Sequence, residues 1–157
     1  LQGYTFQVSS SGEGSLQQLR VVTTGPSRSF AVVQEELDGQ LVRAEVEDLN
    51  SDGVPELVIS AASAGSGSYG SLKAWTVGTQ GSRLQPIVLP ELTAAQARGY
   101  MGHDAFAVVE TTLVRRFPIY RTGDSNADPS GGTRQIQYRM APAEAGWIFR
   151  ADKTLEY

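Results

Sequence analysis

The sequence predicts an all-β protein, an antiparallel β-sandwich or barrel, on three observations. Strand-like runs recur at a spacing of about 8–12 residues. Turn-forming residues separate them, among them Asp38-Gly39 and the run Asn50-Ser51-Asp52-Gly53. Only one short segment has a helical pattern. The 157 residues suit a single domain over 1–157 with its own core, although residues 1–30 carry weaker signals than the rest.

The strands follow from apolar residues in alternation or in short buried runs. Val42, Ala44 and Val46 alternate with charged residues within 40–49, which predicts a strand with one buried face, and Asp38-Gly39 before them predicts a hairpin turn. Leu57, Val58 and Ile59 predict a buried strand. In chain order, the predicted strands are Ser29–Leu37, Gln40–Leu49, Pro55–Ala62, Leu72–Val77, Gln85–Leu89, Ala105–Val109, Leu113–Tyr120, Arg134–Met140 and Gly146–Ala151.

One short helix is expected near residues 93–98. Thr93 is a suitable N-terminal cap, and Gly99 is a suitable stop. The longest polar connection is Gly123–Gly132, between two strands, which has the composition of turns and is longer than a hairpin requires.

Composition and charge exclude several kinds of function. The formal net charge is −4 without a basic cluster, which disfavours nucleic-acid binding. No apolar run approaches the roughly 20 residues that span a bilayer, so no membrane insertion is expected. The chain has no cysteine and a single histidine, His103, which excludes thiolate metal sites and any site with two histidines. We interpret His103 as a structural loop or strand-edge residue rather than a catalytic one.

The acidic segment 48–56 has the spacing of a calcium-binding loop. Asp48, Asn50, Asp52 and Glu56 stand at relative positions 1, 3, 5 and 9, and Gly53 stands at position 6. Position 12, which is glutamate in an EF-hand, is isoleucine here, and the flanking segments have strand patterns. The segment is therefore either a calcium site of another kind or a turn whose side chains bond their own backbone.

The segment 63–71 is a loop of small and hydroxyl-bearing residues between two predicted strands. Gly65, Gly67 and Gly70 let the backbone approach a partner closely, while Ser66, Ser68 and Tyr69 supply hydroxyl groups. Such a loop either connects two strands passively or inserts into a concave site of another molecule.

An ordered set of motifs resembles the family of periplasmic inhibitors of invertebrate-type (i-type) lysozyme from Gram-negative bacteria. The resemblance covers most of residues 44–147. It rests on Asp48-Leu49-Asn50-Ser51-Asp52-Gly53-Val54-Pro55-Glu56-Leu57, Ser63-Ala64-Gly65-Ser66-Gly67-Ser68-Tyr69-Gly70, Arg116-Phe117-Pro118-Ile119-Tyr120 and Gly131-Gly132-Thr133-Arg134-Gln135-Ile136.

The resemblance implies a β-sandwich of about eight antiparallel strands, a periplasmic or secreted location and no catalytic activity. It also implies that Ser66-Gly67-Ser68-Tyr69 inserts into the substrate cleft of an i-type lysozyme, with Ser66 and Tyr69 as the principal contacts. No cofactor is expected, and calcium is not part of inhibition in that family. A second contact is expected near the 123–132 loop, where Arg121 and Arg134 flank it, and a free strand edge would allow a homodimer.

Two alternatives stay open. One is a calcium-binding β-rich adhesion or interaction module built on Asp48, Asn50, Asp52 and Glu56. The other is a carbohydrate hydrolase that uses two of the acidic residues between Glu45 and Glu56, although the same alternation is typical of a solvated strand face.

Overall fold

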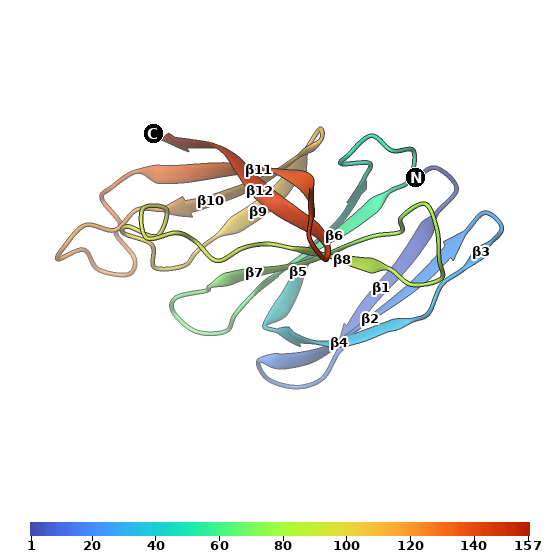
Figure 1. The fold of residues 1–157 in the computed structure, drawn as a ribbon. Coiled ribbons are helices and arrows are strands. Elements are labelled where there is room, and N and C mark those ends of the chain that lie inside the picture. Colours follow the sequence, from blue (N-terminus) through green and yellow to red (C-terminus); the bar gives the residue numbers. More distant parts are fainter.

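The computed structural model describes all residues, 1–157, and consists of twelve strands in two sheets (Figure 1). The smaller sheet holds β1 (Thr5–Ser11), β2 (Leu16–Gly25), β3 (Arg28–Ser29) and β4 (Val33–Asp38). The larger sheet has the order β5-β6-β7-β8-β12-β11-β10-β9. Its strands are β5 (Gln40–Glu47), β6 (Glu56–Ala62), β7 (Gly70–Thr76), β8 (Gln85–Val88), β9 (Ala105–Val109), β10 (Thr112–Pro118), β11 (Thr133–Ala143) and β12 (Gly146–Glu156). The predicted all-β class is confirmed.

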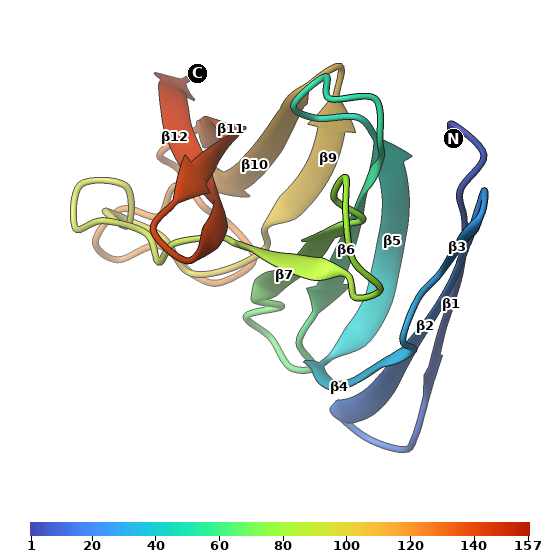
Figure 2. The ribbon, with the colours of Figure 1, turned by 45° about the vertical axis from the view of Figure 1, so that its right-hand side comes forward.

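The larger sheet curves until its two edge strands, β5 and β9, face each other, while the smaller sheet lies against the outer side of β5 to β7 (Figure 2). All pairs are antiparallel except the short parallel pair of β8 with β12, at Trp147↔Ile87 and Ile148↔Val88. The molecule therefore has three successive layers. They are the smaller sheet, the part of the larger sheet with β5 to β7, and the part of the larger sheet with β9 to β12.

Strand β6 is buried on both of its faces, which explains its apolar run Leu57-Val58-Ile59. Leu57 and Ile59 belong to a core between the two sheets, together with Leu19, Leu37 and Trp75. Val58 points the other way, into a second core inside the curved sheet with Phe117, Ile136 and Phe149 among its members. Both cores therefore share one strand.

The predicted hairpin at Asp38-Gly39 is wrong, because β4 and β5 do not pair with each other. Strand β4 pairs with β2 in the small sheet, and β5 pairs with β6 in the large one. Gly39 is the corner where the chain changes sheets, with φ of 102°. A side chain there would come within 2.2 Å of the Ala62 carbonyl oxygen, so the position needs glycine.

The short helix expected near residues 93–98 does not form. Thr93 and Gln96 do make the reciprocal capping bonds, with Thr93 N donating to Gln96 Oε1 (2.9 Å) and Gln96 N donating to Thr93 Oγ1 (3.2 Å). However, the Arg134 guanidinium donates to the carbonyl oxygens of Gln96 (2.8 Å) and Arg98 (2.6 Å). These carbonyl groups would otherwise continue the helix, so the segment ends as a hydrogen-bonded turn at Gly99.

The number of strands exceeds the expected eight, partly because β1 and β2 lie in the weakly patterned first 30 residues. The predicted turn at residues 50–53 is confirmed within the connection of the paired strands β5 and β6. The segments 63–69 and 119–132 likewise connect paired strands, β6 with β7 and β10 with β11.

Candidate functional site: a clamped polar loop

The loop between β6 and β7 is closed at its base by two hydrogen bonds. Ser63 N donates to the Tyr69 carbonyl (2.9 Å), and Tyr69 N donates to Ser63 Oγ (2.9 Å). Within the loop, Ser68 Oγ donates to the Gly65 carbonyl (3.3 Å). Gly65 and Ser68 both have positive φ, 106° and 44°, which bends the chain back tightly. Ala64, Gly65 and Ser66 are left exposed at the tip.

Tyr69 projects from this loop with 48% of its surface exposed. Its ring packs edge-on against the Tyr100 ring, with centroids 5.6 Å apart and planes at 69°. Tyr100 in turn packs on the buried Phe117 ring at 4.7 Å. Tyr69 is therefore held in a fixed direction by Tyr100 while about half of its surface stays exposed. The hydroxyl groups of Ser66 and Tyr69 make no hydrogen bond within the chain.

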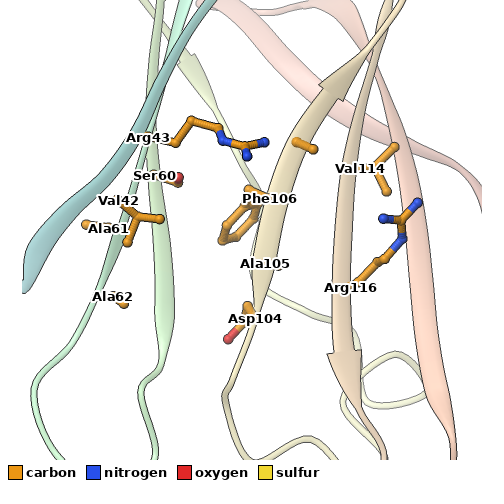
Figure 3. Close-up of a pocket in the computed structure, with 11 residues that line it drawn as sticks. Val42, Arg43, Ser60, Ala61, Ala62, Asp104, Ala105, Phe106, Val114 and Arg116 are labelled. Atoms are coloured by element: carbon orange, nitrogen blue, oxygen red, sulfur yellow. The ribbon is translucent and has the colours of Figure 1, made fainter.

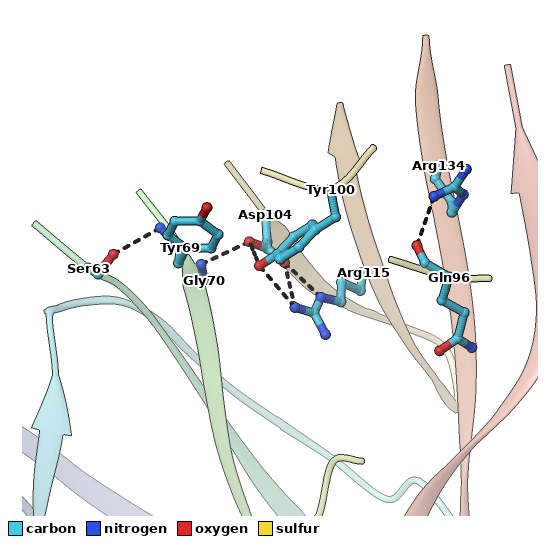
Figure 4. A network of polar contacts seen from close by, with 8 residues as sticks. All are labelled: Ser63, Tyr69, Gly70, Gln96, Tyr100, Asp104, Arg115 and Arg134. Atoms are coloured by element: carbon cyan, nitrogen blue, oxygen red, sulfur yellow. Dashed lines mark hydrogen bonds and ion pairs between the residues drawn. The ribbon is translucent and has the colours of Figure 1, made fainter. Parts of the chain in front are cut away.

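A buried ionic network lies beneath Tyr69 (Figure 4). The Asp104 side chain is fully buried and pairs with the Arg115 guanidinium at 2.7 Å. The same carboxylate accepts hydrogen bonds from Gly70 N (2.9 Å) and from the Tyr100 hydroxyl (2.7 Å). Burial, and then the hydrogen bond to Asp104, raise the pKa of Tyr100 to about 12, so its phenol remains a donor. The network fixes Gly70, the first residue of β7, and the ring that supports Tyr69.

Two further segments hold the tip of the loop. His103 N donates to the Gly67 carbonyl (3.0 Å), and Asn126 Nδ2 donates to the Ser66 carbonyl (2.7 Å). Gly102 allows the first contact, because a side chain there would lie 2.1 Å from the Gly67 oxygen. His103 therefore has the structural loop role that its sequence context predicts. The tip is thus bound to residues that lie 36 and 60 positions away along the chain.

Composition alone indicated the loop but not the residues that hold it. Tyr100, Gly102, Asp104 and Asn126 carry no local motif for this role. Of these four residues, only Gly102 gives a local signal, because glycine readily adopts a positive φ such as the 86° found here.

The two arginines expected as a second contact have different positions. Arg121 is exposed at the start of the 121–130 segment, next to the loop that Asn126 clamps. Arg134 is only 5% exposed and pairs with Glu156 at 2.7 Å while it bonds the 93–98 turn. The structure therefore corrects the expectation for Arg134, whose guanidinium is used within the fold and does not face a partner.

In the acidic segment, oxygen atoms of Asp48, Asp52 and Glu56 lie within 4.8 Å of one another. The two Asp48 oxygens accept Asp52 N (3.1 Å) and Gly53 N (2.9 Å), and Asp52 Oδ1 accepts Val54 N (3.1 Å). Glu56 is fully buried and accepts Leu49 N (2.6 Å) and Thr76 Oγ1 (2.8 Å). Burial raises its pKa to about 7, with smaller contributions from the charges of Asp52 and Asp48. Asn50 Oδ1 is buried and has no partner.

These contacts make the acidic segment a self-bonded turn on a buried glutamate. The backbone N–H groups already occupy the carboxylates of Asp48 and Asp52, as the turn interpretation requires. The same three carboxylates, with the unpartnered Asn50 oxygen, are the residues that would surround a cation.

A hollow of about 320 Å³ lies where the edge strands β5 and β9 face each other (Figure 3). It is lined by apolar residues such as Val42 and Phe106, with Arg43 and Arg116 beside them. Its one acidic lining residue, Asp104, is paired with Arg115. The carboxylate of Glu45, on the neighbouring strand β5, accepts a hydrogen bond from Val108 N (2.9 Å). The hollow does not present the two free carboxyl groups that glycoside hydrolysis requires.

The fold and this site define the class as a small all-β protein that displays a fixed polar loop. The model of the family described as periplasmic lysozyme inhibitor of I-type lysozyme matches residues 31–97. This match confirms the resemblance expected from the sequence over that segment, and the family description agrees with the expected periplasmic location. No curated protein and no solved structure matches the chain.

The matched segment contains the acidic turn and the whole 63–69 loop, whereas His103 and Asn126 lie beyond it. No helix in the structure has the length and apolar character needed to cross a membrane.

Proposed function

We propose that the chain inhibits I-type lysozyme by inserting Ser66-Gly67-Ser68-Tyr69 into the enzyme's substrate cleft, and that it is not itself an enzyme. The observation that carries this proposal is the loop conformation. Tyr69 is half exposed on a rigid support, and the hydroxyl groups of Ser66 and Tyr69 are free of internal partners. The family match over residues 31–97 supplies the enzyme class.

The chemistry of the loop suits a groove built for sugar hydroxyls. Lysozymes cleave glycosidic bonds with a pair of carboxyl groups at the floor of such a groove. A serine hydroxyl that bonds an ionised carboxylate contributes about 1.5–3 kcal/mol. A tyrosine that fills the adjoining subsite supplies the apolar area of an interface anchor. Gly65 and Gly67 keep the loop narrow, and Arg121 on the neighbouring segment would provide the second contact.

The proposal is tested with the double variant Ser66→Ala/Tyr69→Ala in a cell-wall lysis assay with an I-type lysozyme. Loss of one charge-assisted hydrogen bond and one aromatic anchor predicts that the inhibition constant rises about 100-fold or more. The matched control is Ser82→Ala/Tyr157→Ala, which removes the same groups from exposed positions elsewhere. Equal inhibition by both double variants, each with the melting temperature of the wild type, would refute insertion of this loop.

The alternative function is a calcium-dependent interaction module, favoured by the close approach of Asp48, Asp52 and Glu56. It predicts that millimolar calcium raises the melting temperature of the wild type, and that Asp52→Asn abolishes the rise, because binding to the folded state stabilises it. The self-bonded turn predicts the same melting temperature with calcium as with chelator. Differential scanning calorimetry distinguishes the two.

A further inference from the structure

The tip of the 63–69 loop is bridged to two distant segments by one side chain, that of Asn126. Its Nδ2 donates to the Ser66 carbonyl at 2.7 Å, and its Oδ1 lies 3.2 Å from His103 Nε2. Its own carbonyl accepts the Tyr120 hydroxyl at 2.6 Å. Asn126 thus connects the loop tip, the segment before β9 and the segment after β10.

The residues around this bridge have strained backbone conformations. Ser68 and His103 both have positive φ, 44° and 60°, although neither is glycine. Such conformations persist only where surrounding contacts impose them. The contacts here are the bonds from His103 N to the carbonyls of Gly67 (3.0 Å) and Ser68 (3.2 Å), and the stacking of the His103 ring on Tyr120 at 6.3 Å.

We propose that Asn126 is a positioning residue that fixes the loop tip in its binding conformation before the partner arrives. This inference rests on the proposed function and assigns part of the binding energy to a residue outside the loop itself. Asn126 is exposed, but both polar atoms of its side-chain amide are engaged by Ser66 and His103, so in this proposal it acts through these two residues.

The expected loss of affinity follows from the fraction of free molecules whose loop is in the binding conformation. When only a fraction of the free molecules hold the binding conformation, the apparent dissociation constant rises by the inverse of that fraction. A variant that loses the Asn126 bonds to Ser66 and His103 frees the tip of the loop, while the bonds between Ser63 and Tyr69 still close its base. A loop that spends about a tenth of its time in the binding conformation binds about tenfold more weakly.

The variants are Asn126→Ala, which removes both side-chain bonds, and Asn126→Asp, which has the same shape but cannot donate to the Ser66 carbonyl. The control is Asp128→Ala on the same segment, whose side chain accepts a single hydrogen bond, from Ser125 Oγ at 3.2 Å. Inhibition of an I-type lysozyme is measured together with amide hydrogen exchange at Tyr69 and His103 in the free protein.

We expect both Asn126 variants to inhibit about tenfold more weakly than the wild type, with the melting temperature nearly unchanged and with faster exchange at Tyr69 and His103. Asp128→Ala should match the wild type in all three. Weaker inhibition with unchanged exchange would overturn the proposal, because Asn126 would then be a direct contact. Unchanged exchange with unchanged inhibition would overturn it as well.

The exchange measurement separates this proposal from the proposed function. If Asn126→Ala accelerates exchange but the wild type does not inhibit the enzyme, the clamp stands as a property of the loop, and the assignment of the loop to lysozyme fails.

Discussion

At the residue scale, Glu56 is a carboxyl group that the fold removes from water. It is fully buried, and its two oxygens accept bonds from Leu49 N and Thr76 Oγ1. Its pKa of about 7 lies above the ordinary value of 4.5, with burial as the main cause. The folded protein therefore keeps a proton that the unfolded chain releases between those pH values, and the free energy of unfolding falls as pH rises through this range.

We expect Glu56→Gln to flatten this pH dependence. Glutamine is neutral at every pH, and it can accept Leu49 N and donate to Thr76 Oγ1 in the same geometry. Between pH 4.5 and 7, the substitution removes a decrease of roughly 3 kcal/mol in the free energy of unfolding. Urea denaturation at several pH values measures it, with the exposed Glu144→Gln as the control that keeps the wild-type profile. A profile of Glu56→Gln parallel to that of the wild type would contradict the role assigned to this burial.

Residue patterns in the sequence located the loop but not what holds it. Ser66 and Tyr69 stand out locally, because glycine and serine surround one aromatic residue. Asn126 and Asp104 contact the loop from 60 and 34 positions away, and neither belongs to a recognisable motif. Arg134 shows the opposite error, since a cation beside a polar loop suggests a surface contact, whereas tertiary packing buries it against Glu156.

At the scale of elements, apolar alternation or short apolar runs predicted the strands from β4 onward. Alternation failed for β2, whose burial nevertheless alternates regularly. The inward positions of β2 include Gln17 and Thr23, which are buried polar residues that break the hydrophobic pattern. Gln17 is satisfied by bonds to the Gly12 and Gly14 carbonyls, a compensation that only the folded chain provides.

Local signals also misassigned two connections because they do not specify partners. Thr93 and Gln96 form the capping bonds of a helix, yet Arg134 takes the carbonyl groups that the next turn needs. Asp38-Gly39 has the sequence of a hairpin turn, yet the same glycine conformation serves a corner between sheets. Each local conformation was foreseeable, and the long-range contact that determined its use was not.

At the scale of the whole molecule, the two cores are joined by the central strands. Leu57 and Ile59 of β6 pack in the core between the sheets, and Val58 packs in the core inside the curved sheet. Strand β7 is shared in the same way, through Trp75 on one side and Ala74 on the other. Neither core can lose its packing while β6 and β7 keep theirs.

We therefore expect the chain to unfold as one cooperative unit, as a single domain over 1–157 requires. Its two tryptophans report on different cores, since Trp75 is buried in the first and Trp147 packs against the second. In Trp147→Phe the fluorescence follows the first core, and in Trp75→Phe it follows the second. Within each variant, the urea midpoint from fluorescence should coincide with that from far-ultraviolet circular dichroism.

The comparison is made within each variant because the two substitutions change stability by different amounts. Trp75 is almost fully buried, so its replacement removes more packing than that of the partly exposed Trp147. Separate midpoints in either variant would mean that one core melts while the other persists. The support beneath the 63–69 loop comes from Tyr100 and Phe117 of the second core and from the buried Arg115, so a coincident transition would mean that this support lasts as long as the fold itself.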